Sequence, residues 1–250
     1  MQIDINSDLG EGFGDSTLGD DLALLQLVSS ANIACGFHAG DPQVMLRTVE
    51  ACAVAGVAVG AHPGFADPVG FGRRRMILSP IEIRTDVMYQ IGALQSMCKA
   101  VGVPLHHVKP HGAMQNMMVT DYEMSVAFIS AVVDAMDEPL IYAQPGSATE
   151  KAAQDAGIGI AREIFADRAY LADGQLAPRS MAGSVLHETQ EITARMMKML
   201  RGESIETING ETITLQGDTI CVHGDTPAAV EIAQSLRNSL ISAEFSISPV

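Results

Sequence analysis

The segment HHVKPHGAMQNM, which begins at His106, combines three histidines and a lysine within a short and otherwise mostly apolar stretch. Buried strands rarely carry ionisable side chains at this density unless a partner or a ligand binds them. His106 and His107 fall within a predicted strand, and we expect at least one of them to have a structural role. Lys109 and His111 lie just beyond the end of that strand, which makes them candidates for catalysis.

Uncommon polar side chains also lie at the C-terminal ends of five other predicted strands. The candidates for catalysis are Asp8, Glu11, His38, His62, Lys109 and His111. The candidates for binding substrate or phosphate are Asn6, Asp41, Arg73, Glu163, Asp167, Arg168, His223 and Asp225. Parallel β/α folds place their active sites at the C-terminal ends of their strands. This pattern therefore indicates an enzyme with one site built from several strand ends.

Two kinds of chemistry are open to these residues. Asp8, His62 and His111 have the donor types that bind zinc or another divalent ion. The same side chains could instead form a hydrogen-bonded acid/base cluster that holds no metal. Lys109 could neutralise a phosphate or a developing oxyanion, or it could pair with Asp8 or Glu11 for structural reasons.

Two arginines are candidates for binding an anionic group of a substrate. Arg73 lies on a Gly-rich loop, and Arg168 directly follows a strand in the sequence FADR. A guanidinium group can bind a carboxylate or a phosphate through two parallel hydrogen bonds. The chain contains neither GxxxxGK[ST] nor GxGxxG nor GxSxG, so the standard nucleotide-binding and nucleophile-elbow motifs do not apply.

The elements that would position these groups follow a repeated order of short apolar strand, polar or Gly-rich loop, and amphipathic helix. Strands are predicted at about 2–5, 32–34, 57–61, 105–108, 140–143, 159–164 and 219–222. Helices are predicted from about Asp20, Asp41-Pro42, Ser79-Pro80, Asp121, Ser147, His187 and Thr226. Asp or Ser before Pro is a typical helix start, and Glu82 completes a capping box with Ser79. About seven β/α units predict a parallel sheet with helical crossovers.

One segment departs from this order. Residues 204–215, SIETINGETITL, alternate apolar and polar side chains around Asn209-Gly210, which is a strong signal for a β-hairpin. We therefore expect an inserted hairpin there. No linker or shift in composition divides the chain, so residues 1–250 are expected to form a single domain.

The composition excludes some classes of function. The 250 residues carry a formal net charge of −15, which argues against a general nucleic-acid role because phosphate contacts need clustered Lys and Arg. The four cysteines form no CxxC pair and are expected to be reduced. The N-terminus lacks a signal-peptide pattern, and the most apolar run, 51–61, is too short to span a membrane. We expect a soluble cytoplasmic protein without a membrane partner.

Six blocks of the sequence, taken together, resemble the LamB/YcsF family. They are DINSDLGEGFG, NIACGFHAGDP, GAHPGFADPVGFGRR, VKPHGAMQN, EIFADRAYLADGQLAPR and ICVHGD. The blocks occur in the family's order and extend from about residue 3 to about residue 225. Two positions differ from the family's usual residues, because Ser7 stands where Cys is common and Gln115 stands where Tyr is usual.

The resemblance implies a fold and an activity. The fold would be an α/β fold, an irregular seven-stranded (β/α) barrel of the glycoside hydrolase and deacetylase type. The activity would be that of the A subunit of 5-oxoprolinase, which opens 5-oxo-L-proline to L-glutamate with hydrolysis of ATP, together with separate subunits B and C. ATP, with Mg²⁺, would then be a co-substrate. Because no P-loop is present, an ATP site on this chain would be unconventional or would lie partly on a partner subunit.

The roles of individual residues follow as hypotheses. Phosphorylation of the lactam oxygen would create an imidate that water can attack, with Lys109 and Arg168 stabilising the phosphate. A carboxylate such as Asp8 or Glu11, paired with a histidine, would transfer protons.

Two alternatives to this activity remain open at this point. One is a metal-dependent deacetylase or amidohydrolase that acts alone through Asp8, His62 and His111. The other is a non-catalytic carrier protein, which is the weakest because simple binding rarely needs so many ionisable groups. The sequence leaves open whether the chain forms a homo-oligomer.

Overall fold

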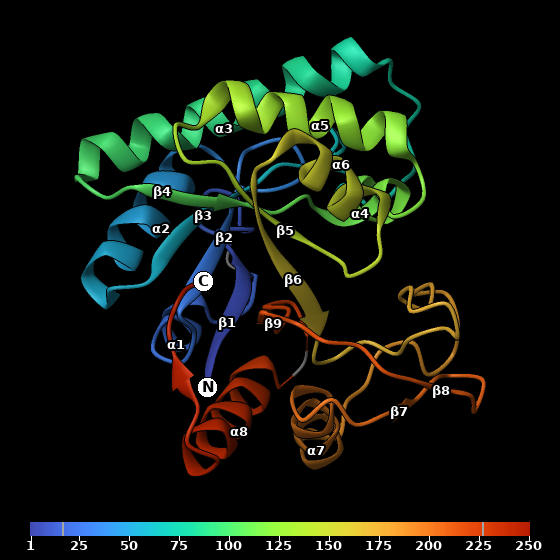
Figure 1. The fold of residues 1–250 in the computed structure, drawn as a ribbon. Coiled ribbons are helices and arrows are strands. Elements are labelled where there is room, and N and C mark those ends of the chain that lie inside the picture. The colour runs from blue at the N-terminus through green and yellow to red at the C-terminus, as the bar shows by residue number, and fades with distance from the viewer. Residues whose placement is uncertain (17, 227) are drawn as a thin grey trace.

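The computed structural model describes residues 1–16, 18–226 and 228–250, and its centre is a closed barrel of seven parallel strands (Figure 1). The strands are β1 (Gln2–Leu9), β2 (Ser30–Ala34), β3 (Ala58–His62), β4 (Leu105–Val108), β5 (Leu140–Ala143), β6 (Gly159–Phe165) and β9 (Thr219–Cys221). Each strand pairs with the next in this order, and β9 closes the barrel by pairing with both β6 and β1. The predicted seven-stranded α/β barrel is confirmed.

The barrel is irregular, as expected. The register between β3 and β4 shifts between Val59 and Gly60, and β4 pairs with β5 through a single residue pair, Val108 and Ile141. A short strand that was not predicted from the sequence, β10 (Ser246–Ile247), pairs with the start of β1 outside the barrel. It brings the C-terminal segment next to the N-terminus (Figure 1).

Helices surround the barrel. They are α1 (Asp21–Leu25), α2 (Pro42–Ala55), α3 (Pro80–Val101), α4 (Gly112–Met118), α5 (Tyr122–Ala135), α6 (Ala148–Ala156), α7 (Thr189–Leu200) and α8 (Ala229–Ser242). The predicted starts of α2 and α3 are confirmed, since Asp41 caps α2 and Ser79 forms a capping box with Glu82 on α3. Among the described helices, none combines the length and the apolar character that crossing a membrane requires.

Other helix boundaries differ from the prediction. The last helix begins at Ala229 rather than at Thr226, and α1 has only five residues. Helix α4 was not predicted; it follows His111 directly and has no side-chain cap. A helix without a capping side chain lacks the signal that marks the starts of α2 and α3.

The predicted hairpin at 204–215 is confirmed. It consists of β7 (Ile205–Glu206) and β8 (Thr212–Ile213), which pair antiparallel around Gly210 at φ +82°. The amide of Ile208 donates a hydrogen bond to the carbonyl of Tyr170 at 2.9 Å, so the hairpin is tied to the long segment that follows β6.

The N-terminal end of the barrel interior is filled by a polar network around the fully buried Asp4. Its two carboxylate oxygens accept hydrogen bonds of 2.6–2.9 Å from the hydroxyls of Ser29, Ser30, Tyr142 and Thr219. These hydroxyls belong to β2, β5, β9 and the turn before β2. The carboxylate therefore joins several strands that are far apart in the sequence.

A histidine fills the next layer of the interior. His107 on β4 is fully buried, its Nε2 lies 2.7 Å from Asn32 Oδ1, and its ring stacks on Tyr142 at 3.9 Å. A side chain on Gly60 would overlap this ring, so glycine is needed on β3 at that point. The structure thus places His107 in the scaffold, as expected for at least one of the two strand histidines.

Asp4→Ala is predicted to destabilise the barrel by about 2–4 kcal/mol, because it leaves several buried hydroxyls without their acceptor. Urea unfolding at neutral pH measures this change. Asp155→Ala, which removes a half-exposed carboxylate paired with Lys151, serves as the control and should change stability by less than about 1 kcal/mol. Equal effects of the two substitutions would contradict the role given to the Asp4 network.

Candidate active site

The C-terminal ends of the barrel strands surround a cavity of about 490 Å³. Eight of the fourteen predicted site residues line it: Asp8, Glu11, His62, Arg73, His111, Arg168, His223 and Asp225. Five other predicted residues are buried beside these: Asn6, His38, Lys109, Glu163 and Asp167. His38, Lys109 and Asp167 contact lining residues directly, and Asn6 and Glu163 contact Lys109. Asp41 lies elsewhere, where it caps α2 and accepts a hydrogen bond from the amide of Gly14. The cavity and the buried side chains next to it therefore include thirteen of the fourteen residues.

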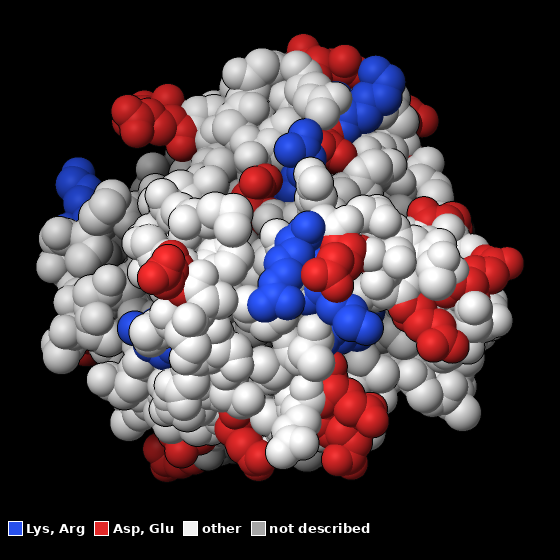
Figure 2. Space-filling model, turned by 60° about the horizontal axis from the view of Figure 1, so that its bottom comes forward, with Lys and Arg blue, Asp and Glu red and all other residues white. Residues whose placement is uncertain are grey.

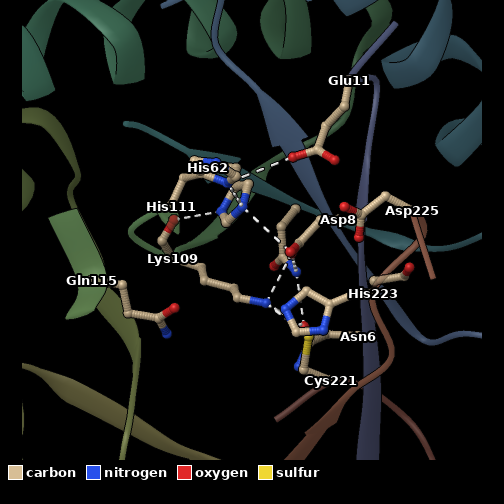
Figure 3. A network of polar contacts seen from close by, with 12 residues as sticks. Asn6, Asp8, Glu11, His62, Lys109, His111, Gln115, Cys221, His223 and Asp225 are labelled. Carbon is tan, nitrogen blue, oxygen red and sulfur yellow. Dashed lines mark hydrogen bonds and ion pairs between the residues drawn. The ribbon is translucent and has the colours of Figure 1, made fainter. Parts of the chain in front are cut away.

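Lys109 holds two carboxylates together beneath this cavity. Its side chain is 1% exposed, and its ammonium lies 2.8 Å from Asp8 Oδ1 (Figure 3). The ammonium also lies 2.8 Å from Glu163 Oε1. It also contacts Asn6 Oδ1 at 3.2 Å and Cys221 Sγ at 3.1 Å. All three N–H donors thus have protein partners, which makes Lys109 a positioning group in this structure.

The charges of this group depend on one another. Burial alone would lower the pKa of Lys109, but the neighbouring Asp8 carboxylate and other groups raise it well above its ordinary value. Burial alone would likewise raise the pKa of Asp8, yet His62 and Lys109 lower it well below its ordinary value. The lysine and the aspartate therefore remain an ion pair at neutral pH.

Three histidine rings pack against one another at the edge of the cavity. His38 stacks on His111 with ring centroids 3.6 Å apart, and His62 meets His111 edge-on at 4.8 Å. His38 Nε2 lies 3.2 Å from Glu11 Oε1. Burial lowers the pKa of His38 and of His111 well below the ordinary value, and burial together with the nearby Asp8 raises the pKa of Glu11.

Two glycines make this packing sterically feasible. A Cβ on Gly72, which has φ +62°, would lie 2.7 Å from His38 Cβ and 2.8 Å from His111 Cδ2. A Cβ on Gly64 would lie 2.9 Å from His38 Nδ1. The Gly-rich loop after β3 therefore lets the backbone approach the histidine rings closely.

A second group is made by Asp167, His223 and Thr226, and a ring nitrogen of His223 lies within 4.8 Å of a carboxylate oxygen of Asp8. Asp167 Oδ1 is 2.8 Å from His223 Nδ1, and the hydroxyl of Thr226 donates to Asp167 Oδ2 at 2.5 Å. The His223 ring stacks near Phe165 and lines the cavity. A carboxylate that orients an imidazole in this way is a common arrangement in general acid/base catalysis.

Arginines give the cavity a positive rim. Arg73 pairs with Asp225 at 2.6 Å, and Arg75 and Arg179, which were not predicted, also line the cavity. Arg168 is buried, and its guanidinium donates to the carbonyls of Ala177 and Ser184, so it holds the loop after β6 in place. In Figure 2, several basic side chains gather near the centre of one face, although the chain as a whole is acidic.

Gln144 is a cavity residue that was not predicted. It follows β5, the one strand end for which no polar candidate was named, and it lines the cavity together with Gln115. Its buried amide has no hydrogen-bond partner within residues 1–16, 18–226 and 228–250. Its place directly after a predicted strand is the signal that could have identified it. An amide at such a place is less conspicuous than a histidine or a carboxylate.

A closed β/α barrel with ionisable groups gathered at its C-terminal mouth has the architecture of a barrel enzyme. A model of the LamB/YcsF family matches residues 3–250, and the chain belongs to this family.

Similar proteins extend over nearly the same length. The A subunit of 5-oxoprolinase from Symbiobacterium thermophilum is 47% identical over 98% of this chain and 94% of its own. The corresponding 5-oxoprolinase protein of Coprothermobacter proteolyticus is 50% identical over 99% and 95%. The crystal structure of a lactam utilization protein from Thermus thermophilus matches with a TM-score of 0.93 and 45% identity, and the match covers all of both chains.

Asp167→Asn is predicted to remove a pH-dependent part of the stability. Burial opposes ionisation of Asp167, but His223 and Thr226 outweigh it and lower the pKa to about 2 from 3.8. A carboxyl group whose pKa is lowered by folding stabilises the folded state at pH values above its unfolded pKa. For Asp167 this contribution is about 2 kcal/mol, and it is lost as the pH falls from about 4 towards 2. The free energy of unfolding should therefore fall less steeply with acid in Asp167→Asn than in the wild type, and parallel curves would contradict this.

Proposed function

We propose that this chain is the A subunit of an ATP-dependent 5-oxoprolinase, which opens the lactam of 5-oxo-L-proline to give L-glutamate. The observation that carries the proposal is the full-length similarity, at 47–50% identity, to proteins that bear the name of this A subunit. The cavity supports it, because the acid/base groups and the arginines line one space. We also propose that residues 1–250 act as a single domain and work with subunits B and C.

The substrate carries one carboxylate, and the cavity offers it a cationic partner. Arg73 lies at the rim beside Asp225, and its side chain is 36% exposed, so it is accessible to a ligand. A guanidinium–carboxylate contact would orient the five-membered ring with its amide towards the interior of the cavity. We assign to Arg73 the binding of this carboxylate.

Coupling to ATP is chemically reasonable because a five-membered lactam is a poor electrophile. Transfer of the terminal phosphoryl group of ATP to the lactam oxygen would release ADP and give a phosphorylated imidate. Water would then add to the former carbonyl carbon, and cleavage of the C–N bond would release the amino group and leave γ-glutamyl phosphate. A second water would hydrolyse this acyl phosphate to glutamate and phosphate. The nucleotide, with Mg²⁺, would bind at an unconventional site or at one shared with a partner protein.

The residues of this chain would supply proton transfer and charge stabilisation. His223, whose Nδ1 lies 2.8 Å from Asp167, would accept a proton from the attacking water. Lys109 keeps Asp8 ionised at the base of the cavity, and its charge stabilises negative charge that develops above it.

A second candidate function is a stand-alone metal-dependent amidohydrolase or deacetylase. The observation that favours it is the group of Glu11, His38, His62 and His111, whose potential ligand atoms all lie within 4.8 Å of one another. The two functions differ in their need for ATP and for partner subunits.

One assay separates the two candidates. The purified chain, alone and together with its B and C subunits, is incubated with 5-oxo-L-proline with and without ATP, and glutamate release is measured. The proposal expects turnover only with ATP and with the partner subunits. Hydrolysis by the chain alone without ATP would contradict it and would support the amidohydrolase.

Lys109→Met is predicted to lower kcat of the reconstituted enzyme by more than about 100-fold, since it removes the charge that keeps Asp8 ionised and stabilises the reaction. Lys151→Met is the matched control, because Lys151 is an exposed lysine paired with Asp155 on α6. Circular dichroism checks that both variants are folded. ATP-dependent turnover that survives in Lys109→Met would exclude the role given to Lys109.

Arg73→Gln is predicted to raise KM for 5-oxo-L-proline about tenfold or more while kcat changes less, because the carboxylate contact forms on binding. Arg84→Gln is the control, since Arg84 forms a comparable exposed ion pair with Asp134. An unchanged KM in Arg73→Gln would show that another group binds the carboxylate.

A further inference from the structure

His62 and His111 each have one ring nitrogen committed to a backbone carbonyl. His62 Nδ1 lies 2.8 Å from the carbonyl oxygen of Lys109, and His111 Nε2 lies 2.8 Å from that of Phe71. A carbonyl oxygen can only accept a hydrogen bond, so each of these nitrogens carries the hydrogen. In the neutral rings, the other nitrogen of each histidine is therefore an acceptor with a free lone pair.

These two acceptor nitrogens face each other. His62 Nε2 and His111 Nδ1 are only 3.0 Å apart, within a part of the site that is almost fully buried. Two lone pairs at this distance repel each other unless a proton or a cation lies with them. His38 does not relieve the contact, because its Nε2 points to Glu11 Oε1 at 3.2 Å.

Two carboxylates complete the surroundings of this nitrogen pair. Asp8 Oδ2 lies 3.5 Å from His62 Nε2, and Glu11 Oε1 lies 3.6 Å from His111 Nδ1. The other oxygen of Asp8 is already bound by Lys109 and Asn32, which leaves Oδ2 directed to the histidines. Figure 3 shows Asp8, Glu11, His62 and His111 around one space at the cavity edge.

The spacing of the two nitrogens suits a shared metal ion, and a carboxylate oxygen lies within 3.6 Å of each nitrogen. Two neighbouring donors at about 2.1 Å from an ion and at right angles to each other lie about 3.0 Å apart, which is the separation of the two nitrogens. Histidine ligands usually donate their second N–H to a carbonyl or carboxylate, as both rings do here. All four residues also line the cavity, so an ion among them would be open to substrate.

We infer that His62 Nε2, His111 Nδ1 and the carboxylates of Asp8 and Glu11 form a binding site for one divalent first-row transition-metal ion, such as Zn²⁺ or Mn²⁺. Imidazole and carboxylate donors together favour such ions over Mg²⁺. His38, whose Nε2 lies 3.2 Å from Glu11 Oε1, orients this carboxylate. When bound, the ion would polarise a substrate oxygen; this role rests on the proposed function, whereas the binding itself does not.

Calorimetric titration of the EDTA-treated chain with Zn²⁺ and, separately, with Mn²⁺ tests the inference. At least one of the two ions should bind with a stoichiometry of one per chain and should raise the thermal unfolding temperature. His62→Gln and His111→Gln should each weaken binding by more than about 100-fold, beyond the roughly 10–100-fold cost of losing an outer hydrogen-bond partner. His187→Gln is the control, because His187 is exposed and lies outside the cluster.

Two results would overturn the inference. One is the absence of stoichiometric binding of either ion, which would mean that a shared proton accounts for the facing nitrogens. The other is binding that His62→Gln and His111→Gln leave unchanged. If circular dichroism shows that a histidine variant is unfolded, Glu11→Gln is used in its place, because it preserves the shape of the side chain. Glu11→Gln should weaken metal binding by about tenfold or more.

The same measurements separate this inference from the proposed function. A chain that binds the ion through these residues but opens no lactam with ATP and its partner subunits contradicts the proposed function alone. ATP-dependent turnover by a chain that binds neither ion contradicts the metal site alone.

Discussion

The ion pairs of Lys109 with Asp8 and Glu163 are the interaction on which the rest of the site depends. The three residues lie at or near the ends of β4, β1 and β6, which are not neighbours in the barrel, so they meet only because the barrel closes. Burying a charge costs several kcal/mol unless its partners are in place. Barrel closure and the charge state of the site are therefore coupled, and loss of one partner leaves the others buried without compensation.

The two ends of the barrel interior show how scaffold and site differ. At the N-terminal end, both carboxylate oxygens of Asp4 accept hydrogen bonds from hydroxyl donors, four in all. At the C-terminal mouth, the acceptor nitrogens of His62 and His111 face each other at 3.0 Å. The side-chain amide of Gln144 there has no hydrogen-bond partner among the described residues. Polar groups that stay incompletely satisfied next to a cavity are typical of functional sites.

Much of this arrangement could be predicted from local patterns in the sequence. Asp41-Pro42 and Ser79-Pro80 mark helix starts, Asn209-Gly210 marks the hairpin, and the polar residues after the strands mark the mouth. These signals depend only on neighbouring residues. What the sequence could not show depends on contacts between distant segments. The direction of the His62 lone pair depends on the carbonyl of Lys109, 47 residues away in the chain. Likewise, the sequence could not show that Arg168, which lines the cavity, also donates to the carbonyls of Ala177 and Ser184 and so anchors the loop after β6.

Substrate is expected to bind and react at the mouth formed by these strand ends, and the crystal structure of the chain with 5-oxo-L-proline bound tests this most directly. We predict the ring in the cavity between His223 and the histidine cluster, with its carboxylate at Arg73. A second cavity lies between α1 and α2, lined by residues such as Gly12, Leu22 and Arg47. Substrate found there, with the mouth of the barrel free of it, would contradict the assignment of the active site.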